Sequence, residues 1–296
     1  LNLAGGGTHS STFLTHAGTT LGFTGGTHSL GDGTHFSGAG SFVGGSTLNL
    51  TGAGAGLMVD AGTSVNLNAL GFGGTGNLTN AGTLTGSGVT LGGSLVNTGT
   101  ASLTGGAPNG GLTNTGTFNV AGTVTLGGAT STLAGGTINL GGGATLVKDG
   151  GMLYWSAGTF GGSGTLAYVN GGNFAFSGNG DRVIDNPNLT FAFTGLTLPN
   201  GSLSLMNGGL TFNGNTSMPV GTALNMYGGT ITNNGPLDIG GLFGLYGGTL
   251  AGAGAINMTG GTIDLPADST VNWIATGAMS NSGTLNLSNR TITNAI

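Results

Sequence analysis

Apolar and small polar residues alternate over short stretches along most of this chain. Glycine interrupts each stretch within a few residues, before a longer pattern can develop. Six such stretches are Thr47–Leu50, Ser64–Leu67, Thr117–Val120, Thr137–Leu140, Ser202–Leu205 and Thr284–Leu287. A period of two directs one set of side chains to a buried face and the other to water, which predicts short β-strands.

A polar phrase, [Asn/Asp]-x-Gly-[Thr/Pro], recurs between these stretches. It occupies residues 60–63, 80–83, 97–100, 114–117, 233–236 and 281–284. Asn and Gly are the residues that best tolerate φ > 0, so the phrase predicts a tight corner. The first four copies start at positions 60, 80, 97 and 114, at nearly equal intervals. Strands separated by corners at a near-constant period are typical of a solenoid.

Helical patterns are nearly absent, because glycine breaks almost every window and the chain has no Glu. The sequence therefore predicts an all-β fold, a single-stranded parallel β-helix (β-solenoid) of roughly 15 coils with about 19 residues each. We expect one continuous solenoid over residues 1–296, with histidine-containing coils at 1–46 and irregular, aromatic-rich coils at 147–199.

Three segments carry a resemblance to a known group of proteins. Asn114–Val120, Gly248–Ile256 and Asn281–Leu287 resemble the repeats of secreted bacterial β-solenoids, namely autotransporter passengers and filamentous-haemagglutinin-type exoproteins. The resemblance covers residues 36–290, unevenly. It implies a right-handed parallel β-helix that is exported from a bacterium to the cell surface or beyond. It also implies a role in adhesion, biofilm or fibre formation, with a minority of such proteins being enzymes.

Composition supplies a core but very little charge. The hydrophobic share is 37%, mean hydropathy is +0.25, and 70 glycines dilute the apolar residues. Charged residues make up 4%, with three basic side chains at Lys148, Arg182 and Arg290 and a net charge of −5. Phosphate binding requires several Lys or Arg, so nucleic acid is excluded as a partner, and a basic membrane-binding face is excluded for the same reason.

Targeting signals are not visible in the sequence. No run of about 18 apolar residues occurs, so no transmembrane helix is expected. The chain opens in mid-pattern without Met, which we interpret as processing or as a segment of a longer protein. The absence of Cys is compatible with export through an oxidising compartment.

All four histidines lie at or before position 35. His9 and His28 are separated by one expected coil, so their side chains are candidates to stack at about one strand spacing and chelate a metal. The alternatives are a polar surface ladder and an end-to-end contact between chains. No Cys or Glu is available to complete a metal shell, and we expect no cofactor.

Carboxylates and aromatic rings gather in residues 147–199. If the strand is extended, Asp181 and Asp185 lie ~13 Å apart, beyond the ~5 to 9.5 Å of acid/base carboxylate pairs. We therefore expect no catalytic residues and no enzyme, although Asp149 approaching from a neighbouring coil would leave a polysaccharide-degrading enzyme as an alternative. The exposed wall around Tyr154, Trp155 and Tyr168 is the expected place for a glycan or host surface to bind, as in an adhesin.

A structural role is the main prediction, because each coil buries its inward face only by stacking on its neighbours. The end coils then present unpaired backbone. We expect end-to-end contacts through Leu1 and Leu3 at one end and Thr291, Ile292 and Ile296 at the other. The partner would be another copy or a neighbouring solenoid segment in an extracellular fibre, stalk or matrix filament.

Overall fold

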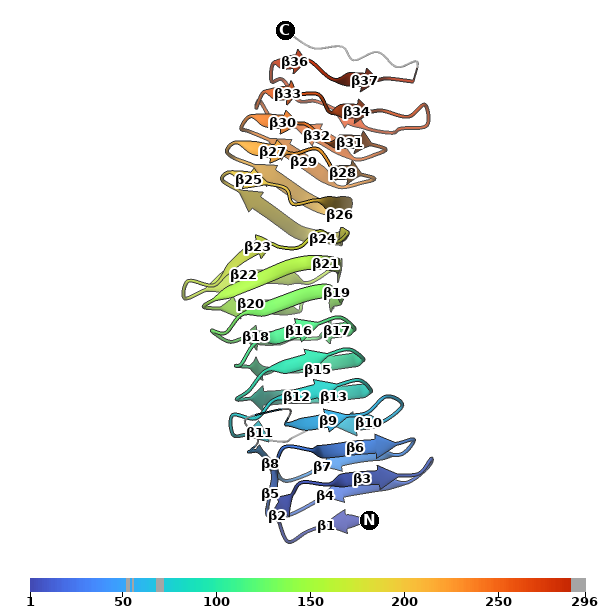
Figure 1. Ribbon diagram of the computed structural model, residues 1–296, viewed down its shortest axis with the longest axis vertical. Coiled ribbons are helices and arrows are strands. Elements are labelled where there is room, and N and C mark those ends of the chain that lie inside the picture. Colours follow the sequence, from blue (N-terminus) through green and yellow to red (C-terminus); the bar gives the residue numbers. More distant parts are fainter. Residues whose placement is uncertain (52–53, 55, 68–71, 289–296) are drawn as a thin grey trace. The chain divides into compact units, whose positions relative to one another are not determined.

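The computed structural model describes residues 1–51, 54, 56–67 and 72–288 (Figure 1). Strands are the regular structure in these residues, and each coil pairs with the next in parallel register. The prediction of an all-β parallel β-solenoid is confirmed. None of the described residues forms a helix that is long and apolar enough to cross a bilayer.

The chain forms two compact units. The first consists of Leu1–Trp155 with Gly164–Ala175, and the second of Ser156–Ser163 with residues from 176 onward. The division falls within the aromatic-rich stretch 147–199, and strands β21 and β23 contribute residues to both units.

The strands of the first unit, with the two shared ones, are short and numerous. They are β1 (Asn2–Leu3), β2 (Gly7–His9), β3 (Thr12–Thr15), β4 (Thr20–Phe23), β5 (Thr27–Leu30), β6 (Thr34–Gly38), β7 (Ser41–Gly44), β8 (Thr47–Leu50), β9 (Leu57–Val59), β10 (Ser64–Asn66), β11 (Phe72–Gly73), β12 (Leu78–Asn80), β13 (Thr83–Leu91), β14 (Leu95–Asn97), β15 (Thr100–Pro108), β16 (Leu112–Asn114), β17 (Thr117–Val120), β18 (Thr123–Leu126), β19 (Ser131–Leu140), β20 (Thr145–Asp149), β21 (Met152–Gly162), β22 (Thr165–Val169) and β23 (Asn173–Phe176).

The second unit continues the same construction. Its strands are β24 (Arg182–Phe193), β25 (Leu196–Thr197), β26 (Gly201–Phe212), β27 (Thr216–Met218), β28 (Thr222–Met226), β29 (Thr230–Asn233), β30 (Leu237–Ile239), β31 (Leu242–Leu245), β32 (Thr249–Ala251), β33 (Ile256–Met258), β34 (Thr262–Asp264), β35 (Asn272–Trp273), β36 (Met279–Asn281) and β37 (Thr284–Asn286).

Coils are on average longer than the sequence predicts, so there are about 13 turns rather than roughly 15. The step from one coil to the next is short between the register partners Thr83 and Thr100 and longer between Gly158 and Arg182. The extra residues lie in loops between strands, where added length costs little because loop-closure entropy grows slowly. The repeated corner phrases at 80–117 sample the shortest coils, which biases an estimate of the period downward.

Columns of like side chains form the core of the first unit. Leu57, Leu78, Leu95 and Leu112 stand in register on four successive coils and are at most 1% exposed. Burying each leucine side chain stabilises the fold by about 1.5–3 kcal/mol.

The core of the second unit has the same organisation. Leu203, Leu224, Phe243 and Ile263 occupy one register position on successive coils, and all are buried. Because every core residue packs on the coil before and the coil after, stability depends on the register of neighbouring coils.

The corner phrase works by a different mechanism from the predicted one. Among its glycines, Gly62 has a positive φ of 82°, whereas Gly99 and Gly116 do not. A Cβ on Gly116 would instead overlap the carbonyl oxygen of Gly99, and a Cβ on Gly99 would overlap that of Gly82. Glycine is therefore required at these stacked corners because successive coils approach too closely for a side chain.

We expect Gly116→Ala to destabilise the first unit by about 1–3 kcal/mol, the usual cost of overpacking a close contact. Gly128→Ala is the matched control, because its Cβ would meet its nearest neighbour, the Asp149 carbonyl oxygen, at 3.9 Å. Urea unfolding followed by circular dichroism measures both variants. Equal unfolding midpoints would show that the corners have room for a side chain.

Candidate functional site

Histidine and phenylalanine side chains form a cluster inside the first two coils of the first unit. This N-terminal cluster consists of His9 on β2, Phe13 on β3, Phe23 on β4, His28 on β5 and Phe36 on β6. The strands of each coil enclose the same interior, so side chains that point inward from these five strands meet there. The ring centroids of His9 and Phe13 are 5.2 Å apart, those of Phe23 and His28 5.0 Å, and those of Phe23 and Phe36 5.6 Å.

The two histidines of the cluster contact each other directly. His9 Nε2 lies 3.0 Å from His28 Nδ1, and the rings stack with centroids 5.3 Å apart. The predicted stacking of His9 and His28 on neighbouring coils is therefore present. Burial and the neighbouring His28 lower the pKa of His9. Among the described residues, no group of three or more His, Cys, Asp or Glu is placed to hold a metal, so metal binding by these two remains a prediction.

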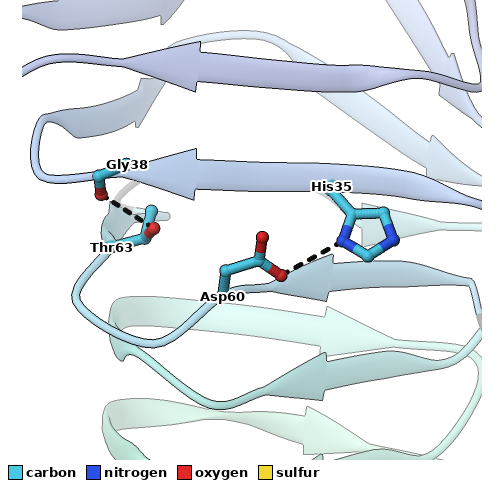
Figure 2. A network of polar contacts seen from close by, with 4 residues as sticks. All are labelled: His35, Gly38, Asp60 and Thr63. Atoms are coloured by element: carbon cyan, nitrogen blue, oxygen red, sulfur yellow. Dashed lines mark hydrogen bonds and ion pairs between the residues drawn. The ribbon is translucent and has the colours of Figure 1, made fainter.

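A second histidine contact joins the next pair of coils. His35 Nδ1 lies 3.1 Å from Asp60 Oδ1, and the Thr63 hydroxyl beside it donates to the Gly38 carbonyl at 2.9 Å (Figure 2). His35 belongs to β6, whereas Asp60 follows β9 one coil later. This contact is partly exposed, with 32% and 35% of the two side chains accessible.

An apolar hollow of about 440 Å³ lies beside the N-terminal cluster. Leu1, Leu3, Phe13, Leu14 and Leu21 contribute to its wall. Leu1 is 85% exposed and Leu14 64%, so this end of the first unit presents apolar surface to solvent. The predicted contact residues Leu1 and Leu3 belong to that surface, whereas Thr291, Ile292 and Ile296 lie outside the described residues.

Two basic residues in the described range, Lys148 and Arg182, are buried rather than displayed. Lys148 is fully buried on β20, and its Nζ donates to the carbonyl oxygens of Gly127 and Ala129. Burial lowers the pKa of Lys148, and the nearby Asp149 carboxylate opposes that shift. The Lys148 ammonium thus supplies hydrogen bonds to two backbone carbonyls from the interior of the solenoid.

Arg182 holds a turn in the second unit. Its Nη1 donates to the Gly180 carbonyl at 2.7 Å, and its Nη2 donates to the carbonyls of Ser177 and Gly178 at 2.6 and 2.9 Å. The guanidinium carbon lies 5.5 Å from the ring centroid of Phe176. Burial lowers the pKa of Arg182, but guanidinium stays protonated in proteins. Backbone carbonyls and an aromatic ring therefore fix this cation beside the turn.

The predicted aromatic wall is only partly exposed. Tyr168 is 39% exposed and Tyr154 is half-buried, whereas Trp155 is fully buried and packs edge-on to Phe174 at 6.0 Å. The prediction that Trp155 lies on an exposed wall is wrong, because its side chain has no accessible surface. Alternation along β21 places Trp155 inward and Tyr154 outward.

The three carboxylates weighed for catalysis make separate structural contacts. Asp149, in the first unit, accepts a hydrogen bond from Asn170 Nδ2 at 2.7 Å. In the second unit, Asp181 accepts from the Ser202 hydroxyl at 2.7 Å and Asp185 from an Asn207 amide at 2.6 Å. Each carboxylate is thus bound to a polar side chain on the following coil.

Sequence reasoning missed an aromatic pair in the second unit, of which Tyr227 is exposed and Tyr246 half-buried. Tyr227 and Tyr246 stack with ring centroids 4.7 Å apart and planes within 8°. Tyr227 is 46% exposed. The pKa of Tyr246 is raised by partial burial, and further by the neighbouring Tyr227 and the Asp264 carboxylate. The signal was present as Tyr-Gly-Gly-Thr at 227–230 and again at 246–249, on the next coil.

Comparison of the chain with protein-family models, curated proteins and solved structures finds no match. The fold itself therefore defines the class, a β-solenoid of stacked parallel strands.

Proposed function

We propose that this chain is a structural β-solenoid of the bacterial cell exterior, contributing to a surface fibre, stalk or matrix filament through stacking and end-to-end contacts. The observation that carries the proposal is that nearly all the aspartate carboxylates of the chain hydrogen-bond to a neighbouring coil. Seven of the eight Asp accept hydrogen bonds from side chains or amides on a neighbouring coil, at Asp32, Asp60, Asp149, Asp181, Asp185, Asp238 and Asp264. Carboxylates committed to tying coils together support a scaffold.

The columns of like residues give further support. Uncharged side chains repeat in register on the outer surface as well, as with Thr83, Thr100, Thr117 and Thr137 on successive coils. A repeat whose stability is a sum of coil and interface contributions is suited to making extended objects. Export and the exterior location rest on the resemblance of the repeats to secreted bacterial solenoids.

End-to-end association is proposed through the apolar hollow at the N-terminal coil. Leu3 on β1 and Phe13 and Leu14 on β3 line the hollow, and within the part of the chain that the structure describes these two strands pair with β4 and β6 alone. Another solenoid coil would cover this apolar surface and continue the parallel hydrogen-bond ladder. Such a coil would come from a second copy or from a neighbouring solenoid segment.

Electron microscopy and analytical ultracentrifugation of the purified chain test this proposal. We expect particles that lengthen as the protein concentration rises, and we expect Leu14→Asp to abolish lengthening by placing a charge in the contact. Val220→Asp is the control, because Val220 is 83% exposed in the second unit. Short, uniform particles at high concentration, or a Leu14→Asp variant that lengthens normally, would contradict the proposal.

An adhesin that binds glycan is the second candidate, favoured by the partly exposed Tyr227–Tyr246 pair. Aromatic side chains with polar neighbours are common in sugar-binding surfaces, because they combine apolar contact area with a hydroxyl. Glycan-array binding by the wild type, lost in Tyr227→Ala and retained in Tyr168→Ala, would favour this candidate. Binding lost only in Tyr168→Ala would return the site to the wall predicted from the sequence.

A further inference from the structure

The His9–His28 contact has a defined proton arrangement at neutral pH. His28 Nε2 lies 3.0 Å from the Gly25 carbonyl oxygen, which can only accept, so this nitrogen carries the proton. His28 Nδ1 is then the acceptor, and His9 Nε2 must donate to it across the 3.0 Å contact. The chain of donors runs from His9 through His28 to Gly25, and it requires His28 to be neutral.

Apolar rings pack against this pair, in which His28 is buried and His9 is half-buried. His28 is 1% exposed, and Phe13 and Phe23 pack edge-on against His9 with centroids 5.2 and 6.3 Å away. Such surroundings disfavour a charged imidazolium, which is the cause of the lowered His9 pKa.

The charged groups on the surrounding strands are directed elsewhere. The Asp32 carboxylate accepts from the amides of Gly54 and Gly56, and His35 contacts Asp60. The Leu1 ammonium donates to the Thr20 carbonyl. Strands β3 and β4 contribute phenylalanine, so the titratable group that faces His9 is His28.

Acid changes this contact in a way that the geometry cannot accommodate. One proton can bind to the outer nitrogen of His9, Nδ1, and leave the hydrogen bond to His28 in place. A second proton would put N–H groups on both facing nitrogens and two positive charges 3.0 Å apart. The folded pair therefore binds fewer protons than the two free imidazoles, and stability falls as pH drops below their ordinary value of about 6.5.

The neighbouring histidine contact has a different partner. His35 Nδ1 lies 3.1 Å from a carboxylate oxygen of Asp60 and not from a second imidazole, so no pair of like charges can form there. The two contacts join different coils, and Figure 2 shows the one between His35 and Asp60. His9 links the first coil (β1–β3) to the second (β4–β6), whereas His35 links the second to the third (β7–β9).

From this geometry we propose that the His9–His28 contact is an acid-sensitive latch: mild acid releases the first coil, β1–β3, while the His35–Asp60 contact keeps the second coil on the third. Release exposes Phe23 and Phe36, each 1% accessible in the closed form, together with the free edges of β4, β5 and β6. Acid would thus uncover an apolar, strand-lined face of the second coil. This inference does not depend on the proposed function.

Amide hydrogen exchange resolved by NMR provides a matched test. The amides of Gly22, Thr24, Gly31 and His35 donate to carbonyls of the first coil and report on the latch. The amides of Ser41, Gly45, Thr51 and Asp60 donate from the third coil to the second and serve as the internal control.

After correction for intrinsic rates, we expect protection of the latch amides to fall about tenfold or more between pH 7.5 and pH 5, the factor for one pKa unit. We expect the control amides to keep their protection. Equal protection of the latch amides at both pH values, or a parallel loss in both sets, would overturn the proposal.

The His9→Gln variant removes one of the two rings that would carry a charge, and its side-chain amide can donate to a neutral His28 or turn to accept from a protonated one. We expect its latch amides to lose their pH dependence, whereas His16→Gln, at an exposed position, should respond as the wild type does. If His9→Gln fails to fold, ring titration of the wild type decides instead. His9 protonating below the value of about 6.5 for a free imidazole supports the latch, and protonation at that value overturns it.

Discussion

Replacing Asn97 by Asp is expected to destabilise the first unit by about 3–5 kcal/mol at pH 7, the cost of leaving a buried charge without a counterpart. Asn97 is fully buried between Asn80 and Asn114, and the three side chains form one ladder across successive coils. Asn80 Nδ2 donates to Asn97 Oδ1 at 2.7 Å, and Asn97 Nδ2 donates to Asn114 Oδ1 at 2.7 Å.

The second oxygen of the introduced carboxylate would face only acceptors. The amide nitrogen that it replaces also donates to the carbonyls of Gly99 and Thr117, at 3.3 and 2.9 Å. Protonating the carboxyl restores one donor, so its pKa in the folded protein is raised above the unfolded value of about 3.9. The full loss is therefore expected above the raised pKa, and stability relative to wild type should recover as pH falls toward 4.

Urea unfolding of wild type and Asn97→Asp at pH 7 and pH 4 measures the effect. Asn119→Asp is the control, because Asn119 lies on the partly exposed face of the same coil as Asn114. A variant equally destabilised at both pH values would mean that the loss comes from packing and not from charge.

The start of the ladder offers the converse experiment. Asn80 Oδ1 is buried and has no hydrogen-bond partner among the described residues, and Val59 occupies its register position on the preceding coil. Val59→Asn would supply a donor to that oxygen, but its own buried amide oxygen would then face Phe36 on the coil before. One buried oxygen without a donor replaces another, so we expect no gain in the free energy of unfolding, and the same urea experiment checks this.

Replacing Arg182 by Met is expected to destabilise the second unit by about 3–5 kcal/mol, because three buried or partly buried carbonyls lose their donors. The three acceptors lie on residues 177–180, between β23 and β24. Met preserves much of the apolar stem volume, so the loss comes from the guanidinium. The turn should then open before the coils on either side.

Hydrogen exchange of amides in residues 177–182, together with urea unfolding, measures this effect. Arg182→Lys should recover only part of the stability, since an ammonium cannot match the planar fork that reaches three carbonyls. Val220→Ala, at an exposed position, should change stability by less than about 0.5 kcal/mol. An Arg182→Met variant as stable as that control would show that the turn holds without its donor.

The secondary structure and the parallel stacking followed from local patterns. Alternation in Thr117–Val120 and Thr137–Leu140, with glycine between, was sufficient for strands in parallel register, and these two strands do pair. The number of coils did not follow, because loop length between strands carries no periodic signal. The phrase at 114–117 predicts a corner, and a corner is present. Glycine is needed at Gly116 because the coils stack closely and not because φ is positive.

Whether a candidate side chain is available at the surface depended on the face of the strand that it occupies. The corner phrase predicts that Asn80, Asn97 and Asn114 are turn residues, yet they point inward and form a buried ladder. Trp155 belonged to a promising aromatic group but faces the core. A shift of one residue in a strand reverses the exposed and buried sets, and a sequence with polar residues on both faces does not fix that choice.

By itself the sequence determined a chain of short parallel strands turning at glycine corners, because alternation and period are local properties that survive in any register. Tertiary structure alone decided that Lys148 and Arg182 are buried, that His9 donates to His28 while His35 contacts Asp60, and which coil each contact joins. These outcomes depend on which residues lie above one another. Coil length varies along the chain, so that alignment is set only once the whole solenoid has formed.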